Sequence, residues 1–388
     1  MFLHQTIKRN KKLIDTAFSL HQRGDILPDS YVIDVDMFLE NAGKILKKAR
    51  GSGITLYFML KQVGRNPYLA RELVNMGYEG AVAVDFKEAM LMMQRGIPLG
   101  NAGHLVQPPR GFTERLVAWG PKVITVYSRE KVWEIEQAAA KLGKRQAVML
   151  RVYEESDRIY SGQSAGFPLE ELWETALWVK TRCPHVEIKG VTSFPCYFYD
   201  EAAGDILPSK NLDTVLKGAG ILGTCGVETS IINTPSATCC RTLEKMARFG
   251  GTCGEPGHGL SGTTPIHAYQ DLEEGPAVVY VSEISHNFLG NGYCFGGGHY
   301  RRSHVSNALV GRDLGTCRQV KAAPPSAESI DYHFELPGES PVGDTVIMAF
   351  RFQMFVTRSD VVLVKGIQDG TPEIVGIYDS QGRKRDGC

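Results

Sequence analysis

The sequence predicts an α/β protein in which a (β/α)8 barrel is followed by a C-terminal, mostly β domain. From residue 31 to residue 265, short apolar and β-branched runs alternate with segments of helical periodicity, as in βα units around a parallel sheet. Eight such runs, each paired with a helical segment over about 220 residues, match the barrel. After Gly275, strand-like runs follow one another without helices. An open, doubly wound sheet is the alternative, because counting strands does not show closure.

Residues 1–30 are expected to form a helical segment outside the barrel, because apolar residues from Leu3 to Phe18 recur at helical spacing. The barrel is expected over residues 31–275. Its strands are predicted near residues 54–60, 80–84, 101–106, 122–127, 147–153, 188–194, 229–234 and 250–254. The helices between them include residues 68–76, 87–95, 129–142, 169–182 and 237–248.

The C-terminal β domain is expected over residues 276–388. Turn clusters rich in glycine, proline and aspartate, such as residues 337–344, separate its apolar runs. The runs predict strands at residues 277–284, 345–356, 361–364 and 374–377. No internal repeat or low-complexity linker interrupts the chain.

Composition excludes several classes of protein. Lysine plus arginine and aspartate plus glutamate each number 43, so no basic excess indicates nucleic-acid binding. No run approaches 18 consecutive apolar residues, and the first residues lack the apolar core of a secretory signal, so no membrane partner is expected. The nine cysteines are odd in number and irregularly spaced, which favours reduced thiols in a cytoplasmic protein and no zinc site.

Lys61 is the first candidate for catalysis. It ends the first predicted barrel strand, and active sites of α/β barrels lie at the carboxyl ends of the strands. Its neighbours from Tyr57 to Leu60 are apolar, so poor solvation would lower the pKa of the amine and favour imine formation. The alternative is a lysine that rims the barrel or pairs with a carboxylate.

A glycine-rich segment, residues 252–265, follows the eighth predicted strand. Its exposed N–H groups suit a phosphate, as does Ser236, which follows the seventh strand near a helix start. Glu255 lies inside the segment, where a carboxylate needs a cationic partner such as a protonated pyridine nitrogen. A plain glycine-rich turn is the alternative.

These features together resemble the fold-type III pyridoxal-phosphate enzymes, the alanine racemase and ornithine decarboxylase-like superfamily. Within it, the chain is most similar to predicted amino-acid racemases, and the resemblance covers about residues 30–300. The segments that carry it, besides the lysine and the glycine-rich loop, are Tyr31 to Asn41, Leu60-Lys61, Asn66-Pro67, Ala83-Val84-Asp85 and Glu88-Ala89.

The resemblance implies pyridoxal 5′-phosphate as the cofactor, held as an imine on Lys61. Glu255 would contact the pyridine nitrogen, as the glutamate of the decarboxylase branch does, whereas alanine racemases place an arginine there. Gly257, His258 and Ser236 would surround the phosphate. His258 stands where the decarboxylases have an arginine next to the phosphate.

Two more residues are candidate cofactor contacts. Arg65 stands where the family has a tyrosine four residues after the lysine, so a guanidinium would replace a phenol at the phosphate. Gln163 follows the fifth predicted strand and could reach the phenolic oxygen of the cofactor or the substrate carboxylate. A solvated loop is the alternative for Gln163.

Tyr293 and Cys294 are the candidates for the second proton-transfer group. Their segment, residues 287–300, is similar to the GY-x-DG turn by which racemases supply a base from the partner subunit, although no aspartate follows here. Cys294 could instead act as the β-domain cysteine of the decarboxylases does. A glycine-rich turn with buried aromatic rings is the alternative.

The resemblance therefore implies an amino-acid racemase that removes the Cα proton from the substrate–cofactor imine. Lys61 would act on one face, and Tyr293 or Cys294 on the other, in a homodimer with shared active sites. A decarboxylase or lyase of the same fold is one alternative, and a non-catalytic cofactor carrier is another. A Schiff-base aldolase that uses Lys61 without a cofactor is the third.

Overall fold

The computed structural model describes residues 1–385, which form two compact units. One comprises Met1–Lys44, Lys61–Leu69 and the chain from His258 onward, and it is called the β-domain unit here. The other comprises Ile45–Leu60 and Ala70–Gly257 and is called the barrel unit. Cys388, one of the nine cysteines counted above, lies outside the described residues.

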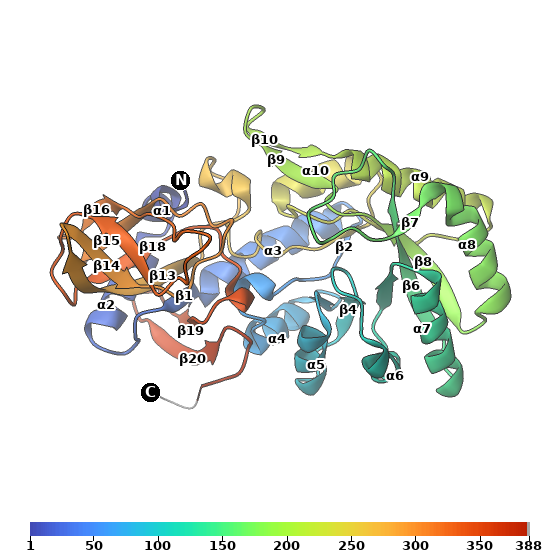
Figure 1. The fold of residues 1–388 in the computed structure, drawn as a ribbon, viewed down its shortest axis with the longest axis horizontal. Coiled ribbons are helices and arrows are strands. Elements are labelled where there is room, and N and C mark those ends of the chain that lie inside the picture. The colour runs from blue at the N-terminus through green and yellow to red at the C-terminus, as the bar shows by residue number, and fades with distance from the viewer. Residues whose placement is uncertain (386–388) are drawn as a thin grey trace. The chain divides into compact units, whose positions relative to one another are not determined.

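Eight parallel strands form the ring of the barrel unit (Figure 1). The predicted barrel is confirmed, because the strand order ends at β2 and β3 and a parallel bridge between Phe58 and Ala81 joins those two ends. All eight predicted strands are present, in shortened or shifted form. In ring order they are β2 (Thr55–Leu56), β12 (Cys253–Gly254), β11 (Ile231–Asn233), β8 (Val186–Thr192), β6 (Gln146–Tyr153), β5 (Val123–Val126), β4 (Leu99–Ala102) and β3 (Ala81–Ala83).

Helices lie outside this ring, and their ends follow from local sequence. Asp85 caps α5 by accepting a hydrogen bond from the Glu88 amide, while the Glu88 carboxylate accepts one from the Val84 amide. Ser128 caps α7 in the same way. The helices are α3 (Val35–Gly51), α4 (Pro67–Met76), α5 (Phe86–Gln94), α6 (Arg110–Trp119), α7 (Arg129–Lys141), α8 (Leu169–Arg182), α9 (Lys210–Thr224) and α10 (Cys240–Arg248).

The interior of the barrel is filled by side chains from alternate strand positions. Tyr57, Met59, Val82, Val123 and Met149 belong to one buried cluster. Three short strands lie off the ring: β7 (Phe167–Pro168), which pairs with β6, and the hairpin β9 (Tyr197–Asp200) and β10 (Asp205–Pro208).

The β-domain unit is built on a sheet with one interior strand that comes from near the N-terminus. β1 (Ser30–Asp34) pairs antiparallel with β13 and parallel with β19. Residues 31–34 fall within the predicted barrel range of 31–275, whereas the structure has them in this sheet. All five residues of β1 are buried, and a short buried strand has the same apolar sequence pattern in either kind of sheet. The others are β13 (Val278–Phe288), β14 (Asn291–Phe295), β15 (Asn307–Gly311), β16 (Arg318–Lys321), β17 (His333–Pro337), β18 (Thr345–Met348), β19 (Asp360–Lys365) and β20 (Glu373–Asp379).

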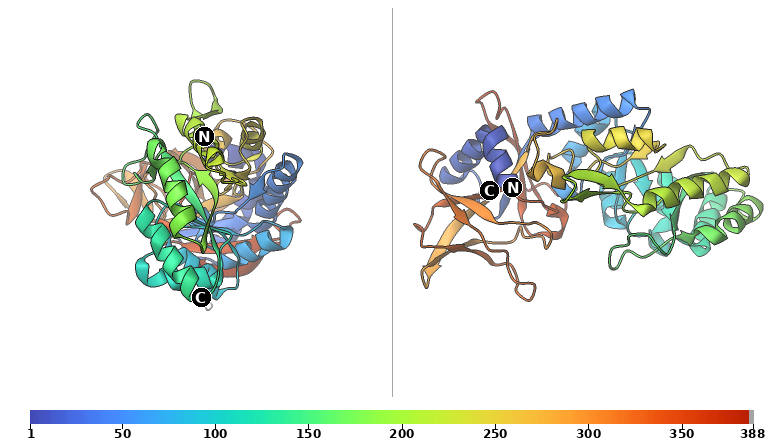
Figure 2. Two further views of the ribbon diagram at one scale, coloured as in Figure 1. Left: turned by 90° about the vertical axis from the view of Figure 1, so that its right-hand side faces the viewer. Right: turned by 90° about the horizontal axis from the view of Figure 1, so that it is seen from above.

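Two N-terminal helices, α1 (Phe2–Arg9) and α2 (Lys11–Gln22), pack on this sheet (Figure 2). Leu13, Ile14 and Phe18 are fully or almost fully buried against Val279 and Ile347 of the sheet. The predicted amphipathic segment is therefore two helices, separated at Asn10, whose side chain caps α2.

Three 3-10 turns complete the unit: η1 (Lys61–Val63), η2 (Pro265–Ala268) and η3 (Met354–Val356). No helix among residues 1–385 is both long enough and apolar enough to cross a membrane. No disulfide joins the eight cysteines within that range. No group of three or more metal-ligating side chains was found among the described residues.

Candidate active site

A buried carboxylate lies at the carboxyl ends of the barrel strands. Glu255 follows β12, and its side chain has no exposed surface. Its Oε1 accepts hydrogen bonds from Nδ2 of Asn101, at 2.9 Å, and from Nδ2 of Asn233, at 3.0 Å. Its Oε2 lies 3.4 Å from Nε2 of His104. Burial of a carboxylate costs free energy unless such donors compensate for lost water, so these side chains fix the carboxylate in place.

The two asparagines are themselves held by threonines on neighbouring strands. Oγ1 of Thr125 donates to Oδ1 of Asn101, which leaves the Asn101 amide nitrogen directed at the carboxylate. Nδ2 of Asn233 also donates to Oγ1 of Thr192, at the end of β8. The backbone amide of Glu255 donates to a side-chain oxygen as well, Oγ1 of Thr238. These hydrogen bonds therefore hold the carboxylate in one position.

Burial and the negative charge of Glu255 together raise the pKa values of neighbouring acidic groups. Burial, and then the charge of this carboxylate, raise the pKa of the Cys253 thiol well above its usual value. Burial also raises the pKa of Tyr57, and the charge of Glu255 makes a smaller contribution. The barrel end thus stabilises a cation and opposes a second anion.

Ser236 lies in a loop with an unusual backbone. Ser236 and Ala237 both have positive φ angles, 97° and 50°, which non-glycine residues adopt only when the fold supports them. Oγ of Ser236 donates to the carbonyl of Tyr197 and accepts from its amide. The loop leads into α10, whose N-cap residue, Cys239, makes no side-chain capping bond to the backbone.

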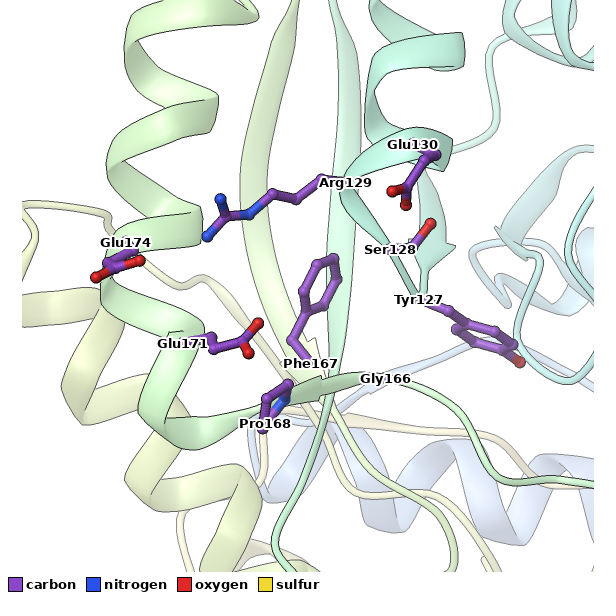
Figure 3. Close-up of a pocket in the computed structure, with 9 residues that line it drawn as sticks. All are labelled: Tyr127, Ser128, Arg129, Glu130, Gly166, Phe167, Pro168, Glu171 and Glu174. Carbon is purple, nitrogen blue, oxygen red and sulfur yellow. The ribbon is translucent and has the colours of Figure 1, made fainter.

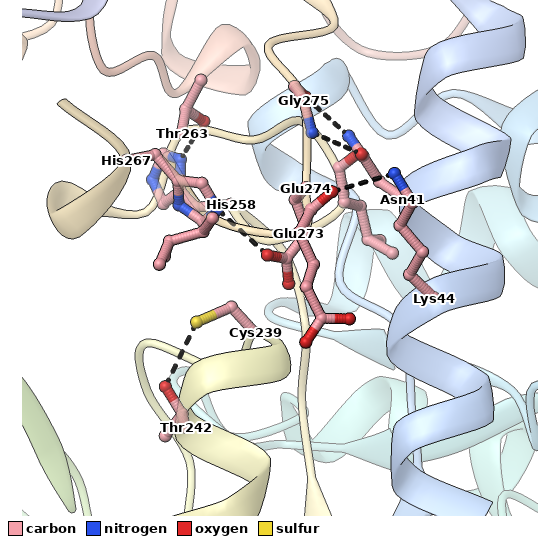
Figure 4. Close-up of polar contacts among 12 residues, drawn as sticks. Asn41, Lys44, Cys239, Thr242, His258, Thr263, His267, Glu273, Glu274 and Gly275 are labelled. Atoms are coloured by element: carbon pink, nitrogen blue, oxygen red, sulfur yellow. Dashed lines mark hydrogen bonds and ion pairs between the residues drawn. The ribbon is translucent and has the colours of Figure 1, made fainter. Parts of the chain in front are cut away.

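The sulfur of Cys239 instead lies 3.3 Å from Oγ1 of Thr242 (Figure 4). A nine-residue helix with no capping side chain presents N–H groups next to the serine predicted to bind the phosphate.

Lys61 begins η1 in the β-domain unit and is half-buried. The four residues before it, from Tyr57 to Leu60, are all buried, as the apolar run predicted. The positive charge of Lys61 contributes to lowering the pKa of His258 in the same unit.

His258 is buried in the β-domain unit and bonded at both ring nitrogens. Its Nδ1 lies 3.0 Å from Oγ1 of Thr263, within the loop that Figure 4 shows. Its Nε2 lies 3.2 Å from Nε of Arg351 and 3.2 Å from Nε2 of Gln353. Burial, and then the charge of Arg351, hold the pKa of His258 well below its usual value, so the ring is neutral.

The loop that contains His258 is anchored from two sides. Nδ2 of Asn41 donates to the carbonyls of Leu260 and Gly275, and its Oδ1 accepts from the Gly275 amide (Figure 4). Nε2 of His267 lies 3.2 Å from Oε2 of Glu274, and both side chains are almost fully buried. Asn41, part of the family resemblance, thus positions this loop.

Arg65 is buried within the β-domain unit and has a positive φ of 53°. Its Nη1 donates to Oε1 of Gln381 at 2.9 Å, and its guanidinium lies 4.9 Å from the ring centroid of Phe355. A role for Arg65 at the cofactor stays a prediction. Its observed contacts are with the C-terminal part of the unit.

Gln163 lies in the barrel unit, in the loop between β6 and β7. Its backbone carbonyl accepts a hydrogen bond from Nη2 of Arg151, whereas its Oε1 is buried without a hydrogen-bond partner among the described residues. Arg151 lies on β6 and its guanidinium is 5.1 Å from the ring centroid of Tyr127. The contact of Gln163 with a ligand stays a prediction.

Tyr293 and Cys294 point to opposite sides of β14. Cys294 is fully buried, and burial raises the pKa of its thiol to about 12. The Tyr293 ring stacks on His286 at 4.9 Å and is half-buried. A ligand from outside the β-domain unit would therefore meet Tyr293 without rearrangement, whereas Cys294 would have to leave the interior.

A separate cavity of about 510 Å³ opens at the β5–α7 turn and the start of α8 (Figure 3). Arg129 lines it, but the guanidinium donates to Oγ1 of Thr175 and packs on Trp178. The acidic side chains of Glu130, Glu171 and Glu174 also line this cavity. It does not include Glu255 or any other site residue predicted from the sequence.

Sequence reasoning missed Asn101, Asn233 and His104, and it did not connect His258 with Arg351. A signal for the asparagines exists, because each interrupts an otherwise apolar strand at its carboxyl end. No such signal exists for Arg351, which lies 93 residues from His258 in the chain.

Comparisons with known proteins identify the family of the chain. The family "Alanine racemase, N-terminal domain" matches residues 33–265, and the family "YhfX-like, C-terminal domain" matches residues 279–374. The protein YhfX of Escherichia coli (strain K12) is 46% identical over 385 residues, which cover 98% of this chain and 99% of that protein.

Solved structures share the fold at low sequence identity. D-threonine aldolase from Filomicrobium marinum has a TM-score of 0.66 at 14% identity, covering 92% of this chain and 96% of that one. Alanine racemase of Clostridium difficile 630 in complex with cycloserine has a TM-score of 0.63 at 16% identity, with coverages of 92% and 99%.

D-threo-3-hydroxyaspartate dehydratase from Delftia sp. HT23 has a TM-score of 0.65 at 13% identity, with coverages of 90% and 97%. These neighbours therefore include a racemase, an aldolase and a dehydratase on one fold. The match over the barrel, the C-terminal match and the relative at 46% identity show that the chain belongs to the alanine racemase N-terminal domain family, the fold-type III pyridoxal-phosphate enzymes.

Proposed function

We propose that the protein is a pyridoxal-phosphate-dependent amino-acid racemase. The observation that carries the use of this cofactor is the immobilised carboxylate of Glu255, on which Asn101 and Asn233 converge. The resemblance of the segment around Lys61 to racemases favours racemisation among its reactions. A buried anion fixed in this way suits a cation, and the ring nitrogen of the cofactor is protonated when a carboxylate faces it. When bound, the cofactor accepts the electron pair that remains at Cα after a bond to Cα breaks.

The residues present fit such a group. Lys61 has the amine that bonds the carbonyl carbon of the cofactor, and the apolar run before it reduces solvation of that amine. Glu255 would hold the proton at the ring nitrogen. Ser236, Gly257 and His258 would bind the phosphate, with the N-terminal amides of α10 following Ser236. Arg65 and Gln163 are proposed as further cofactor contacts.

Racemisation needs a proton donor and a proton acceptor on opposite faces of the Cα atom. Lys61 would move the proton on one face after the substrate replaces it at the cofactor. We assign the other face to Tyr293 of a second subunit in preference to Cys294, because the thiol is buried and its pKa is raised to about 12. The working unit would then be a homodimer with shared active sites.

A lyase is the second candidate, and Glu255 is the observation that favours it. A ring nitrogen held in its protonated form supports decarboxylation and elimination as well as racemisation. The aldolase and the dehydratase among the structural neighbours have the same fold.

One experiment distinguishes the two reactions. The purified protein, loaded with the cofactor, is incubated with a panel of amino acids in deuterated water. Racemisation incorporates deuterium at Cα of both enantiomers and releases no carbon dioxide. Stoichiometric carbon dioxide, an aldehyde, or a keto acid with ammonia would instead assign the protein to the lyases.

A further inference from the structure

The hydrogen bonds around His258 determine where its proton lies. Arg351 can only donate through Nε, so Nε2 of His258 must accept and carries no proton. The proton of the neutral ring is then on Nδ1 and is donated to Oγ1 of Thr263 at 3.0 Å. Oγ of Ser261 lies 2.8 Å from that same hydroxyl and extends the chain of contacts.

His258 therefore cannot supply positive charge. It is buried, and the charge of Arg351 opposes a second proton on the ring, which agrees with its strongly lowered pKa. The other charges that act on it, from Lys61, His267 and Arg302, are also positive. The decarboxylase branch has an arginine at this position of the chain, so this protein lacks the guanidinium that residue 258 would otherwise provide.

We propose that Arg351 replaces that guanidinium and binds the phosphate of pyridoxal 5′-phosphate, with His258 holding it in position. The proposal rests on the proposed use of this cofactor. The Nε of Arg351 donates to the imidazole at 3.2 Å, which fixes the plane of the guanidinium. Gln353 contacts the same imidazole nitrogen from two residues further along the chain and is itself buried.

A phosphate-specific role has a readout that a structural role does not share. Apo protein is titrated with pyridoxal 5′-phosphate and, separately, with pyridoxal, which forms the same bond to an amine but has no phosphate. Binding is followed by visible absorbance. Arg351→Gln should raise the Kd of pyridoxal 5′-phosphate about 10- to 100-fold, because a charge-assisted contact is lost. The Kd of pyridoxal should change less than about threefold.

Three further variants keep the result interpretable. Arg351→Lys, which keeps the charge, should recover part of the affinity. His258→Arg added to Arg351→Gln should restore affinity for the phosphorylated form, because the guanidinium returns to position 258. Arg358→Gln is the control, since that exposed arginine of the same unit pairs with Asp331 at 2.9 Å.

Two results would overturn the assignment of Arg351. One is that Arg351→Gln binds pyridoxal 5′-phosphate as tightly as the unaltered protein. The other is that it loses affinity for both ligands equally, which indicates a structural role. If the unaltered protein binds neither ligand, the proposed function fails and this inference fails with it.

Discussion

Asn101 and Asn233, 132 residues apart in the chain, donate hydrogen bonds to the same oxygen atom, Oε1 of Glu255. Each stands at the carboxyl end of a different barrel strand, β4 or β11. The two amides leave the second oxygen, Oε2, facing His104. The barrel thus holds the carboxylate in a fixed orientation. That orientation depends on the register of β4 and β11, because the register sets where the two asparagines lie.

Replacing Glu255 by glutamine should slow Cα deuterium exchange about 100-fold and leave the Kd of pyridoxal 5′-phosphate within about threefold. The reason is that a neutral amide no longer favours the proton on the ring nitrogen when charge develops at Cα. Rates in deuterated water and absorbance titrations measure the two effects. Glu171→Gln, on the separate cavity of the barrel unit, should change neither. A normal exchange rate in Glu255→Gln would exclude a contact between Glu255 and the ring nitrogen.

Asn233→Ala should reduce the exchange rate less than the loss of the carboxylate does, by about tenfold. It removes one of the donors to Oε1 and also the contact with Thr192, so the carboxylate gains freedom. Asn101→Ala should have a similar effect. If the exchange rate falls as far in these variants as in Glu255→Gln, the asparagines contact the ligand themselves.

Lys61→Ala should abolish both turnover and the visible absorbance of the reconstituted protein, because no other amine is expected to bond the cofactor. Borohydride reduction of the unaltered protein followed by peptide mapping should label the peptide that contains Lys61. Lys141→Ala, an exposed lysine paired with Glu114, serves as the control. A label on a different lysine contradicts the assignment.

Tyr293→Phe should block proton transfer on one face of Cα, so that one enantiomer exchanges its proton and the other does not. Cys294→Ala should preserve exchange of both enantiomers and lower the free energy of unfolding by about 1–2 kcal/mol, since it removes buried atoms from the β-domain unit. Chiral chromatography and urea unfolding measure these outcomes. The reverse pattern would assign the proton transfer to the thiol despite its burial.

The stability of the β-domain unit should depend on the protonation of Asp29. Burial raises the pKa of Asp29 to about 6, against opposing hydrogen bonds from Ser359 and Tyr280. A raised pKa in the folded state stabilises the protein at low pH, and this contribution is lost as pH rises from about 4 to above 6.

Asp29→Asn should remove this dependence and raise the free energy of unfolding at pH 7.5 by about 1–2 kcal/mol. Asparagine also tolerates the positive φ of 62° at this position. Urea unfolding at pH 5 and pH 7.5 tests the expectation, with the exposed Asp25→Asn as control. An unchanged pH profile would show that Asp29 is ionised in the folded protein throughout.

Much of the barrel could be predicted from the sequence because each strand is a short apolar run whose burial is local information. Closure could not, since it rests on a bridge between Phe58 and Ala81 that no periodicity encodes. Strands β14 to β17 were not predicted. A glycine interrupts the apolar pattern of β14, and exposed polar residues such as Arg318 and Gln319 interrupt that of β16.

The candidate site was likewise only partly predictable from the sequence. Glu255 could be singled out because a carboxylate in a glycine-rich loop is unusual, whereas its partners come from strands far apart in the chain. The neutral state of His258 depends on Arg351, and a contact over that separation requires the folded chain.

The position of β1 sets the order in which this protein can complete its folding during synthesis. Ser30–Asp34 leave the ribosome early, but the hydrogen-bonding partners of this strand are β13, more than 240 residues later, and β19, which follows about 80 residues after that. Both edges of a fully buried strand therefore stay without partners while the entire barrel is made. The nascent chain must keep this apolar segment from pairing wrongly until its last strands emerge.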